Sequence, residues 1–258
     1  MTATVPASPP GIAPAGLAGL LLSMADDEFV IGFWDSEWTG IAPMLEEDVA
    51  MSSISQDEIG HARALYELLA SLTDDDADRI AFGRTADEFR HAALMNHART
   101  DWAFTIARRY LYETADAVRL ESLARSSFEP LAQLAAKMRR EETYHRMHLD
   151  TWLRRLAGGS AHERLASALE RAWADAQALF SPLPDEAQLV AAGILPDSLG
   201  ELRRRWLAHV TPVLATLELL PARTPEPAPD GRRSRTEEFR WLHGEFTMVA
   251  GSEEGATW

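Results

Sequence analysis

The sequence predicts an all-α protein, and composition and breaker residues both support that prediction. Ala, Leu, Arg and Glu, which favour helix, are abundant among the 258 residues, whereas alternating runs of β-branched residues are scarce. Only 15 Gly and 14 Pro are present, and the Pro residues gather near the two ends. Because 46% of the residues are hydrophobic, the chain can bury a substantial core, as one large domain or two small ones.

The breakers divide the chain into helices of different lengths. We expect four long helices, paired as two hairpins, over residues 16–38, 43–71, 101–127 and 130–156. Pro43 and Pro130 suit the first turns of the second and fourth of these helices. A polar crossover of residues 73–100 separates the hairpins. Two hairpins joined by a longer crossover are the connectivity of a ferritin-like four-helix bundle.

The chain is expected to have three parts. Residues 1–15 form a flexible arm, and residues 16–220 form the ferritin-like domain, with extra C-terminal helices that begin at residues 162–180. Residues 221–258 form a linker and a tail helix at 237–248, which packs on the bundle or on a partner. The segments after the fourth helix carry large apolar anchors that suit an interface, although some are expected to pack within the chain: Trp173, Trp206, Trp241 and Trp258.

Charge and cysteine content exclude several classes of function. The net charge of −15 disfavours nucleic acids and anionic membranes as partners, because both are polyanions. The absence of Cys excludes disulfides, thiolate metal sites and iron–sulfur clusters, and it fits a cytoplasmic protein. The apolar stretch 17–22 is too short to cross a bilayer, and it lacks the basic flank of a signal peptide.

Two Glu-x-x-His motifs mark the second and fourth long helices. They are Glu58 with His61 and Glu142 with His145. Residues three apart lie side by side on one helical face, so each motif offers a carboxylate oxygen and an imidazole nitrogen to one point. A single such motif is weak, because Glu and His are common on helix surfaces. Apolar residues accompany these motifs on the same faces, which favours burial.

One lone acid on each preceding helix strengthens the metal interpretation. Glu28 lies 30 residues before Glu58, and Glu113 lies 29 residues before Glu142. Nearly equal spacings allow both half-sites to lie in one layer of a bundle. Four carboxylates and two imidazoles are the ligand set of di-iron and di-manganese proteins. We therefore predict two iron ions, with manganese as the alternative, held by Glu28, Glu58, His61, Glu113, Glu142 and His145.

Other candidate residues are expected to lie on the surface and to have no role as metal ligands. A third Glu-x-x-His motif, Glu88 with His91, lies in the crossover without a hairpin partner, and it is expected on the surface. His148, one turn after His145, is expected to be exposed, with a role beside the metal ligands as the alternative.

Four further segments are informative: DSEWTGIAP at 35–43, QDEIGH at 56–61, DWAFTIAR at 101–108 and EETYH at 141–145. These segments resemble the family that holds the catalytic and structural subunits of bacterial phenylacetyl-CoA epoxidase. The tail from GRRSRTEE at 231–238 resembles the structural subunit of the family, the C subunit, whereas all six ligand positions match the metal-bearing pattern of the catalytic A subunit. The resemblance covers nearly the whole chain.

The resemblance implies an oxygenase component. Its di-iron centre would use O2 to epoxidise the ring of an aromatic acyl-CoA in phenylacetate catabolism. The resemblance also implies two partners, a separate flavin/iron–sulfur reductase and a homologous catalytic subunit. The reductase is needed because the chain lacks Cys and a Gly-rich nucleotide fingerprint. The alternative is a non-catalytic scaffold subunit of that complex. A ferroxidase or a manganese catalase is a distant third, which the ligands allow and the tail does not favour.

Overall fold

The computed structural model describes residues 14–73 and 75–252, and over these residues the backbone forms α-helices and short 3-10 helices without a β-strand. The prediction of an all-α, ferritin-like chain is confirmed. The arm expected at the N-terminus falls almost wholly outside the described residues, as does Trp258.

The described residues fall into two units. Unit 1 consists of two stretches of the chain, one that ends at Ala98 and one that begins at Arg233, and unit 2 is Arg99–Arg232. Unit 1 contains α1 (Pro14–Ser36), α2 (Leu45–Thr73), α3 (Ala77–Phe82), the 3-10 helices η1 (Ala86–Glu88) and η2 (Ala93–Asn96), and α9 (Glu237–Thr247). Unit 2 contains α4 (Trp102–Leu123), α5 (Glu129–Ala157), α6 (His162–Ala176), the 3-10 helix η3 (Gln177–Phe180), α7 (Glu186–Ala191) and α8 (Leu199–Thr216).

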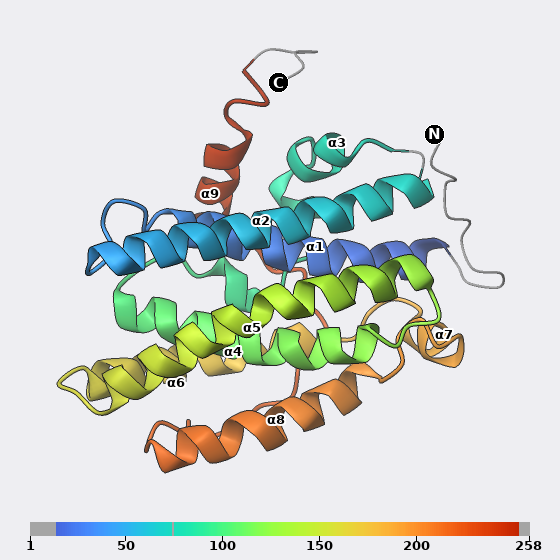
Figure 1. Cartoon of the computed structure of the whole chain (residues 1–258). Helices are drawn as coiled ribbons and strands as arrows, with labels where there is room; N and C mark the ends of the chain where they lie inside the picture. The colour runs from blue at the N-terminus through green and yellow to red at the C-terminus, as the bar shows by residue number, and fades with distance from the viewer. Residues whose placement is uncertain (1–13, 74, 253–258) are drawn as a thin grey trace. The chain divides into compact units, whose positions relative to one another are not determined.

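In unit 1, α1 and α2 form a long antiparallel hairpin, drawn in two shades of blue (Figure 1). Its turn uses Gly40 at a φ of +84°, a conformation that costs other residues energy. Asp48 Oδ1 accepts hydrogen bonds from the backbone nitrogen atoms of Gly40 at 2.8 Å and Ala42 at 3.2 Å, which ties the turn to α2. These contacts explain why the hairpin reverses where Thr39-Gly40 predicted a stop.

Gly32 lets α1 approach α2 closely in the middle of this hairpin. A Cβ atom on Gly32 would lie 2.9 Å from Ile59 Cγ1 and 3.1 Å from Glu58 Cβ, closer than packed carbon atoms tolerate. The missing side chain therefore brings the two backbones together beside Glu58.

Two buried carboxylates of α1 accept hydrogen bonds from the crossover that links the two hairpins. Asp26 accepts hydrogen bonds from Arg84 Nη2 at 2.6 Å, from the Tyr66 hydroxyl at 2.6 Å and from the Arg90 backbone nitrogen at 2.5 Å. Asp27 accepts one from the Ala92 backbone nitrogen at 2.8 Å. Because Asp26 and Asp27 directly precede Glu28, the anchored crossover also restrains the part of α1 that carries that residue.

The expectation that His91 lies on the surface is wrong. His91 is fully buried, its Nε2 lies 3.0 Å from Asn96 Oδ1, and its ring packs on Phe239 with centroids 4.1 Å apart. Glu88 turns away, accepts hydrogen bonds from the backbone and hydroxyl of Thr85, and caps η1. The crossover pattern looked polar, but Phe89 and its apolar neighbours belong to the core.

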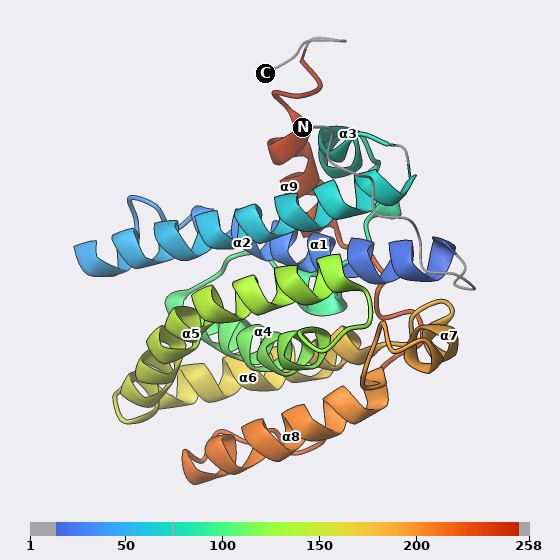
Figure 2. The same cartoon turned by 45° about the vertical axis from the view of Figure 1, so that its right-hand side comes forward.

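The C-terminal helix belongs to unit 1. In Figure 2, α9 rises steeply from the α1–α2 hairpin. Thr236 Oγ1 donates to the Asn96 carbonyl at 3.0 Å and also caps α9, and His243 Nε2 lies 2.8 Å from the Arg84 carbonyl. The Phe246 ring packs edge-on against Phe29 with centroids 5.0 Å apart. Trp241 stacks on Trp34 but stays 53% exposed.

In unit 2, α4 and α5 form the second long hairpin, and α6 and α8 pack on α4. Asp101 caps α4 by accepting a hydrogen bond from the Phe104 backbone nitrogen at 2.8 Å, and Pro130 lies in the first turn of α5, as predicted. Trp173 and Trp206 are buried and stack with centroids 5.2 Å apart. Two of the four predicted aromatic anchors therefore serve this unit's own core.

None of the helices in the described ranges combines the length and the low charge needed to cross a membrane.

Candidate metal centre

The first triad, Glu28, Glu58 and His61, lies within the α1–α2 hairpin of unit 1. Each residue offers a ligand atom within 4.8 Å of those of the other two, and His61 Nδ1 lies 3.6 Å from Glu28 Oε2. The carboxylates of Glu28 and Glu58 are fully buried, and His61 is 4% exposed. The hairpin therefore gathers the three side chains that sequence spacing assigned to one half-site.

The second triad, Glu113, Glu142 and His145, lies within the α4–α5 hairpin of unit 2. His145 Nδ1 lies 3.3 Å from Glu142 Oε1 and 3.7 Å from Glu113 Oε1. All three side chains are buried, and their ligand atoms lie within 4.8 Å of one another. The second half-site thus repeats the composition of the first.

The donor chemistry of both triads fits a metal ion. Two carboxylates within a few ångströms of each other repel, and burying them is costly unless a cation compensates their charge. Carboxylate oxygen with imidazole nitrogen suits iron or manganese. The expected spacing of a helical hairpin, with one acid opposite a Glu-x-x-His pair, is realised in each unit.

Sequence reasoning missed Arg109, which lies beside the second triad. Its side chain is fully buried in α4, and its Nη2 forms an ion pair with Glu113 Oε1 one helical turn later. The four-residue spacing of an Arg and a Glu was visible in the sequence. It gave no signal, because such pairs are common on exposed helix surfaces.

His148 differs from its expected exposure. The ring is partly buried in α5 and stacks on Tyr144 with centroids 6.4 Å apart. Burial, together with smaller electrostatic contributions from Arg109 and His145, lowers the pKa of His148 to about 4. His148 is therefore neutral at physiological pH.

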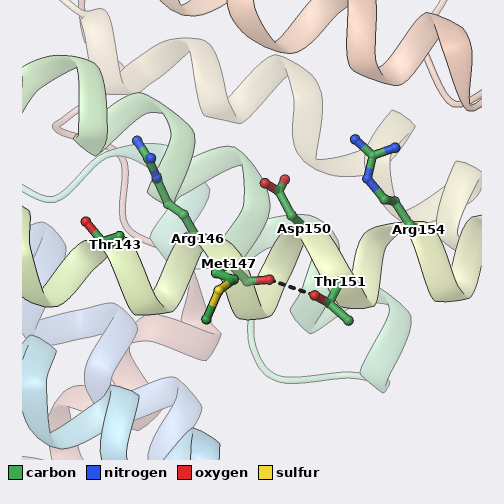
Figure 3. A pocket seen from close by; sticks show the side chains of 6 residues that line it. All are labelled: Thr143, Arg146, Met147, Asp150, Thr151 and Arg154. Carbon is green, nitrogen blue, oxygen red and sulfur yellow. Dashed lines mark hydrogen bonds between the residues drawn. The ribbon is translucent and has the colours of Figure 1, made fainter.

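Two surface pockets of unit 2 lie along α5. One has a volume of about 320 Å³ and is lined by α5 alone, with Arg146, Asp150 and Arg154 rising from the same side of the helix (Figure 3). No residue of the second triad lines it. The other has a volume of about 280 Å³ and is lined by Ala117, Glu121, Arg139, Glu142, Thr143 and Arg146. Glu142 of the second triad is therefore among the residues that line this second pocket.

A helical chain whose two hairpins each carry a buried Glu, Glu and His has the construction of the ferritin-like carboxylate metal proteins. Comparison with known proteins narrows this class. The family model described as phenylacetic acid catabolic protein matches residues 7–258, so the chain belongs to that family.

Two curated relatives from Escherichia coli K12 are similar to the chain, and both are parts of 1,2-phenylacetyl-CoA epoxidase. The C subunit is 30% identical over 197 residues, which cover 75% of this chain and 79% of the relative. The A subunit is 27% identical over 212 residues, which cover 79% of this chain and 66% of the relative. The predicted family resemblance is confirmed by the family model and by both relatives.

Proposed function

We propose that the chain is a subunit of a multicomponent phenylacetyl-CoA epoxidase and that its two triads supply the six ligands of one di-iron centre. The observation that carries the proposal is the grouping of Glu, Glu and His in each hairpin of a chain from this family. Manganese is the alternative metal, because the same donors accept it.

The residues of the chain would hold and tune the centre. Glu28 and Glu58 in one triad, and Glu113 and Glu142 in the other, carry four negative charges that balance two divalent ions. Bound iron would supply the binding and activation of O2. The burial of the ligands would exclude bulk water, which strengthens the electrostatic contacts and limits side reactions.

The proposed reaction requires partners. The cysteine-free chain cannot hold an iron–sulfur cluster for electron delivery, so we propose a separate flavin/iron–sulfur reductase. The second partner that we propose is a homologous catalytic subunit, which the similarity to both epoxidase relatives supports. The substrate that we propose is an aromatic acyl-CoA, and the location is the cytoplasm. Trp241, Met248 and Val249 are exposed apolar side chains in or just after α9 that can serve the contact between subunits.

A scaffold subunit is the second candidate, and one observation favours it. The identity to the C subunit is 30% over 79% of its length, against 27% over 66% of the length of the A subunit. In that case the chain would stabilise a catalytic homologue, and its own metal would be structural. A ferroxidase or a manganese catalase has the support of the donor set alone, and family membership gives it none.

Metal analysis and reconstitution test the proposal. The chain purified from iron-replete cells should contain close to two iron ions, alone and with its partner. Epoxidation of phenylacetyl-CoA should require the partner and the reductase, and Glu58→Ala in this chain should abolish turnover if its own centre is catalytic. Full turnover by a complex that contains metal-free Glu58→Ala would establish the scaffold role. A chain without iron or manganese would refute the metal centre.

A further inference from the structure

The exposed side of α5 is strongly basic, although the chain as a whole is acidic. The net charge of the chain is −15, whereas the exposed side chains of residues 137–155 include six cations and one acid, Asp150. The cations are Lys137, Arg139, Arg140, Arg146, Arg154 and Arg155. These residues form a surface that we call the basic face of α5, and it belongs wholly to unit 2.

The charge of the basic face is not compensated by ion pairs. No acid among residues 14–73 and 75–252 forms an ion pair with any of the six cations, although exposed arginines elsewhere do pair, such as Arg63 with Glu67. Cations that are neighbours on one helix repel each other. An anionic surface that docks there would relieve this repulsion, so the charge favours an acidic partner.

Two large apolar side chains lie in the middle of the basic face. Tyr144 is 48% exposed and Met147 is 63% exposed, and a spacing of three residues makes them neighbours on the helix. Arg140 lies one turn before Tyr144, and Arg154 lies two turns after Met147. Figure 3 shows Met147 and Arg154 projecting from α5. An apolar centre with a charged rim, rich in Tyr, Met and Arg, is typical of protein interfaces.

The extent of the basic face also favours a protein as its partner. Residues 137–155 cover about 27 Å of helix, at a rise of about 1.5 Å per residue. Permanent subunit contacts are large and hydrophobic, whereas transient electron-transfer encounters are small and depend on charge. With Tyr144 and Met147 as its large exposed apolar side chains, the basic face fits the transient kind.

The basic face adjoins the second triad. The proposed ligands Glu142 and His145 are buried on the same helix, and Arg146 directly follows His145. The ring of Tyr144 contacts the ring of His145, with centroids 6.4 Å apart. Because the rate of electron transfer falls steeply with distance, a protein that docks here would be well placed to deliver electrons to the proposed centre.

We propose that the basic face of α5 is the docking surface for the reductase, which presents an acidic surface to it. The inference rests on the proposed function, because it assumes a centre that accepts electrons. Epoxidation places one atom of O2 in the ring and reduces the other to water, which consumes two protons and two electrons. The reductase gives up these two electrons and is thereby oxidised.

Binding of the reductase to the metal-loaded, full-length chain tests the inference. The reductase is the one that supports epoxidation in the reconstituted complex, and surface plasmon resonance measures its affinity. The affinity should fall by at least about tenfold from low to high salt, because salt screens exposed charges. Arg140→Glu combined with Arg154→Glu should weaken binding at low salt by about tenfold or more and should remove most of the salt dependence.

Arg204→Glu is the matched control for the charge reversal. Arg204 lies on α8, outside the basic face, and its side chain is 72% exposed. This variant should change the affinity by less than about threefold. Tyr144→Ala tests the apolar centre, and it should weaken binding by at least about fivefold at high salt as well. Circular dichroism and Mn²⁺ titration of each variant measure folding and metal binding without the reductase.

A folded Arg140→Glu, Arg154→Glu chain that binds the reductase as tightly as the unsubstituted chain would overturn the inference and leave the metal centre intact. The same holds if the unsubstituted chain does not bind the reductase, or if the double variant loses only the homologous subunit or only ADP, a phosphate probe. A chain that binds neither iron nor manganese would overturn the proposed function itself. If the double variant does not fold, Arg140→Ala with Arg154→Ala, which keeps good helix formers, should weaken binding by about threefold or more.

Discussion

The close approach of α1 to α2 at Gly32 predicts that one added methyl group will disturb the first triad. In Gly32→Ala, the new Cβ would lie 2.9 Å from Ile59 Cγ1, 3.1 Å from Glu58 Cβ and 3.2 Å from the Ser55 carbonyl oxygen. Overpacking of this kind costs about 1–3 kcal/mol. Replacing a helical Gly by Ala returns about 0.5–1 kcal/mol. The net expectation is a loss of about 0–2.5 kcal/mol of unfolding free energy, and the variant should be about 1–3 kcal/mol less stable than a chain with a Gly-to-Ala change that brings no overpacking.

Gly60→Ala is the matched control, because Gly60 lies inside the Glu58–His61 motif and its added Cβ would meet no atom within 4 Å. This variant should gain about 0.5–1 kcal/mol from helix propensity alone. Urea unfolding followed by circular dichroism measures both changes, and Mn²⁺ titration measures the effect on the triad. Gly32→Ala should weaken Mn²⁺ binding, because the displaced helices move Glu58, whereas Gly60→Ala should not. A Gly32→Ala chain as stable as Gly60→Ala would refute the close approach of the helices.

Three further perturbations have expected outcomes. Glu142→Ala should abolish binding of a metal ion at the second triad with helical content retained by circular dichroism, whereas Glu88→Ala should leave metal content unchanged; the reverse result would mean that the half-sites are misassigned. Asp26→Ala should cost up to about 3–5 kcal/mol in urea unfolding, because it removes the carboxylate that pairs with the largely buried Arg84 guanidinium. Glu67→Gln should cost less than about 1 kcal/mol, because the pair of Glu67 with the exposed Arg63 is screened by water. Truncation from Thr236 removes three buried side chains of α9, each worth about 1.5–3 kcal/mol, so it should destabilise unit 1; a truncated chain with an unchanged melting profile would show that α9 is dispensable for its fold.

The long helices and the two triads could be predicted because they depend on local periodicity. Pro43, Pro130 and the Thr39-Gly40 stop mark the long hairpins to within a few residues of the observed helices. Helical spacing of three residues places Glu58 beside His61 whatever the surrounding fold. Glu28 and Glu113 could be assigned to the two half-sites because they precede Glu58 and Glu142 by nearly equal numbers of residues.

The crossover could not be interpreted in the same way. Glu88 and His91 have the spacing of the metal motifs, but the backbone between them leaves the helical conformation after η1. Their side chains consequently part, Glu88 to cap η1 and His91 to pack beneath α9. The same residue pattern gives a different structure there, because residues 140 or more positions away contact the segment and bury it.

The sequence by itself was sufficient to predict a set of metal ligands, the grouping of these residues within each hairpin and the family of the chain, because these features depend on residue identity and short-range spacing. Only the tertiary structure decided how the charges are compensated. Arg109 became a partner of Glu113 because α4 is buried on the face that carries both, and an exposed pair of the same spacing would have little effect on its neighbours. The physical reason is desolvation, which makes a buried charge consequential and which is set by the packing of distant segments.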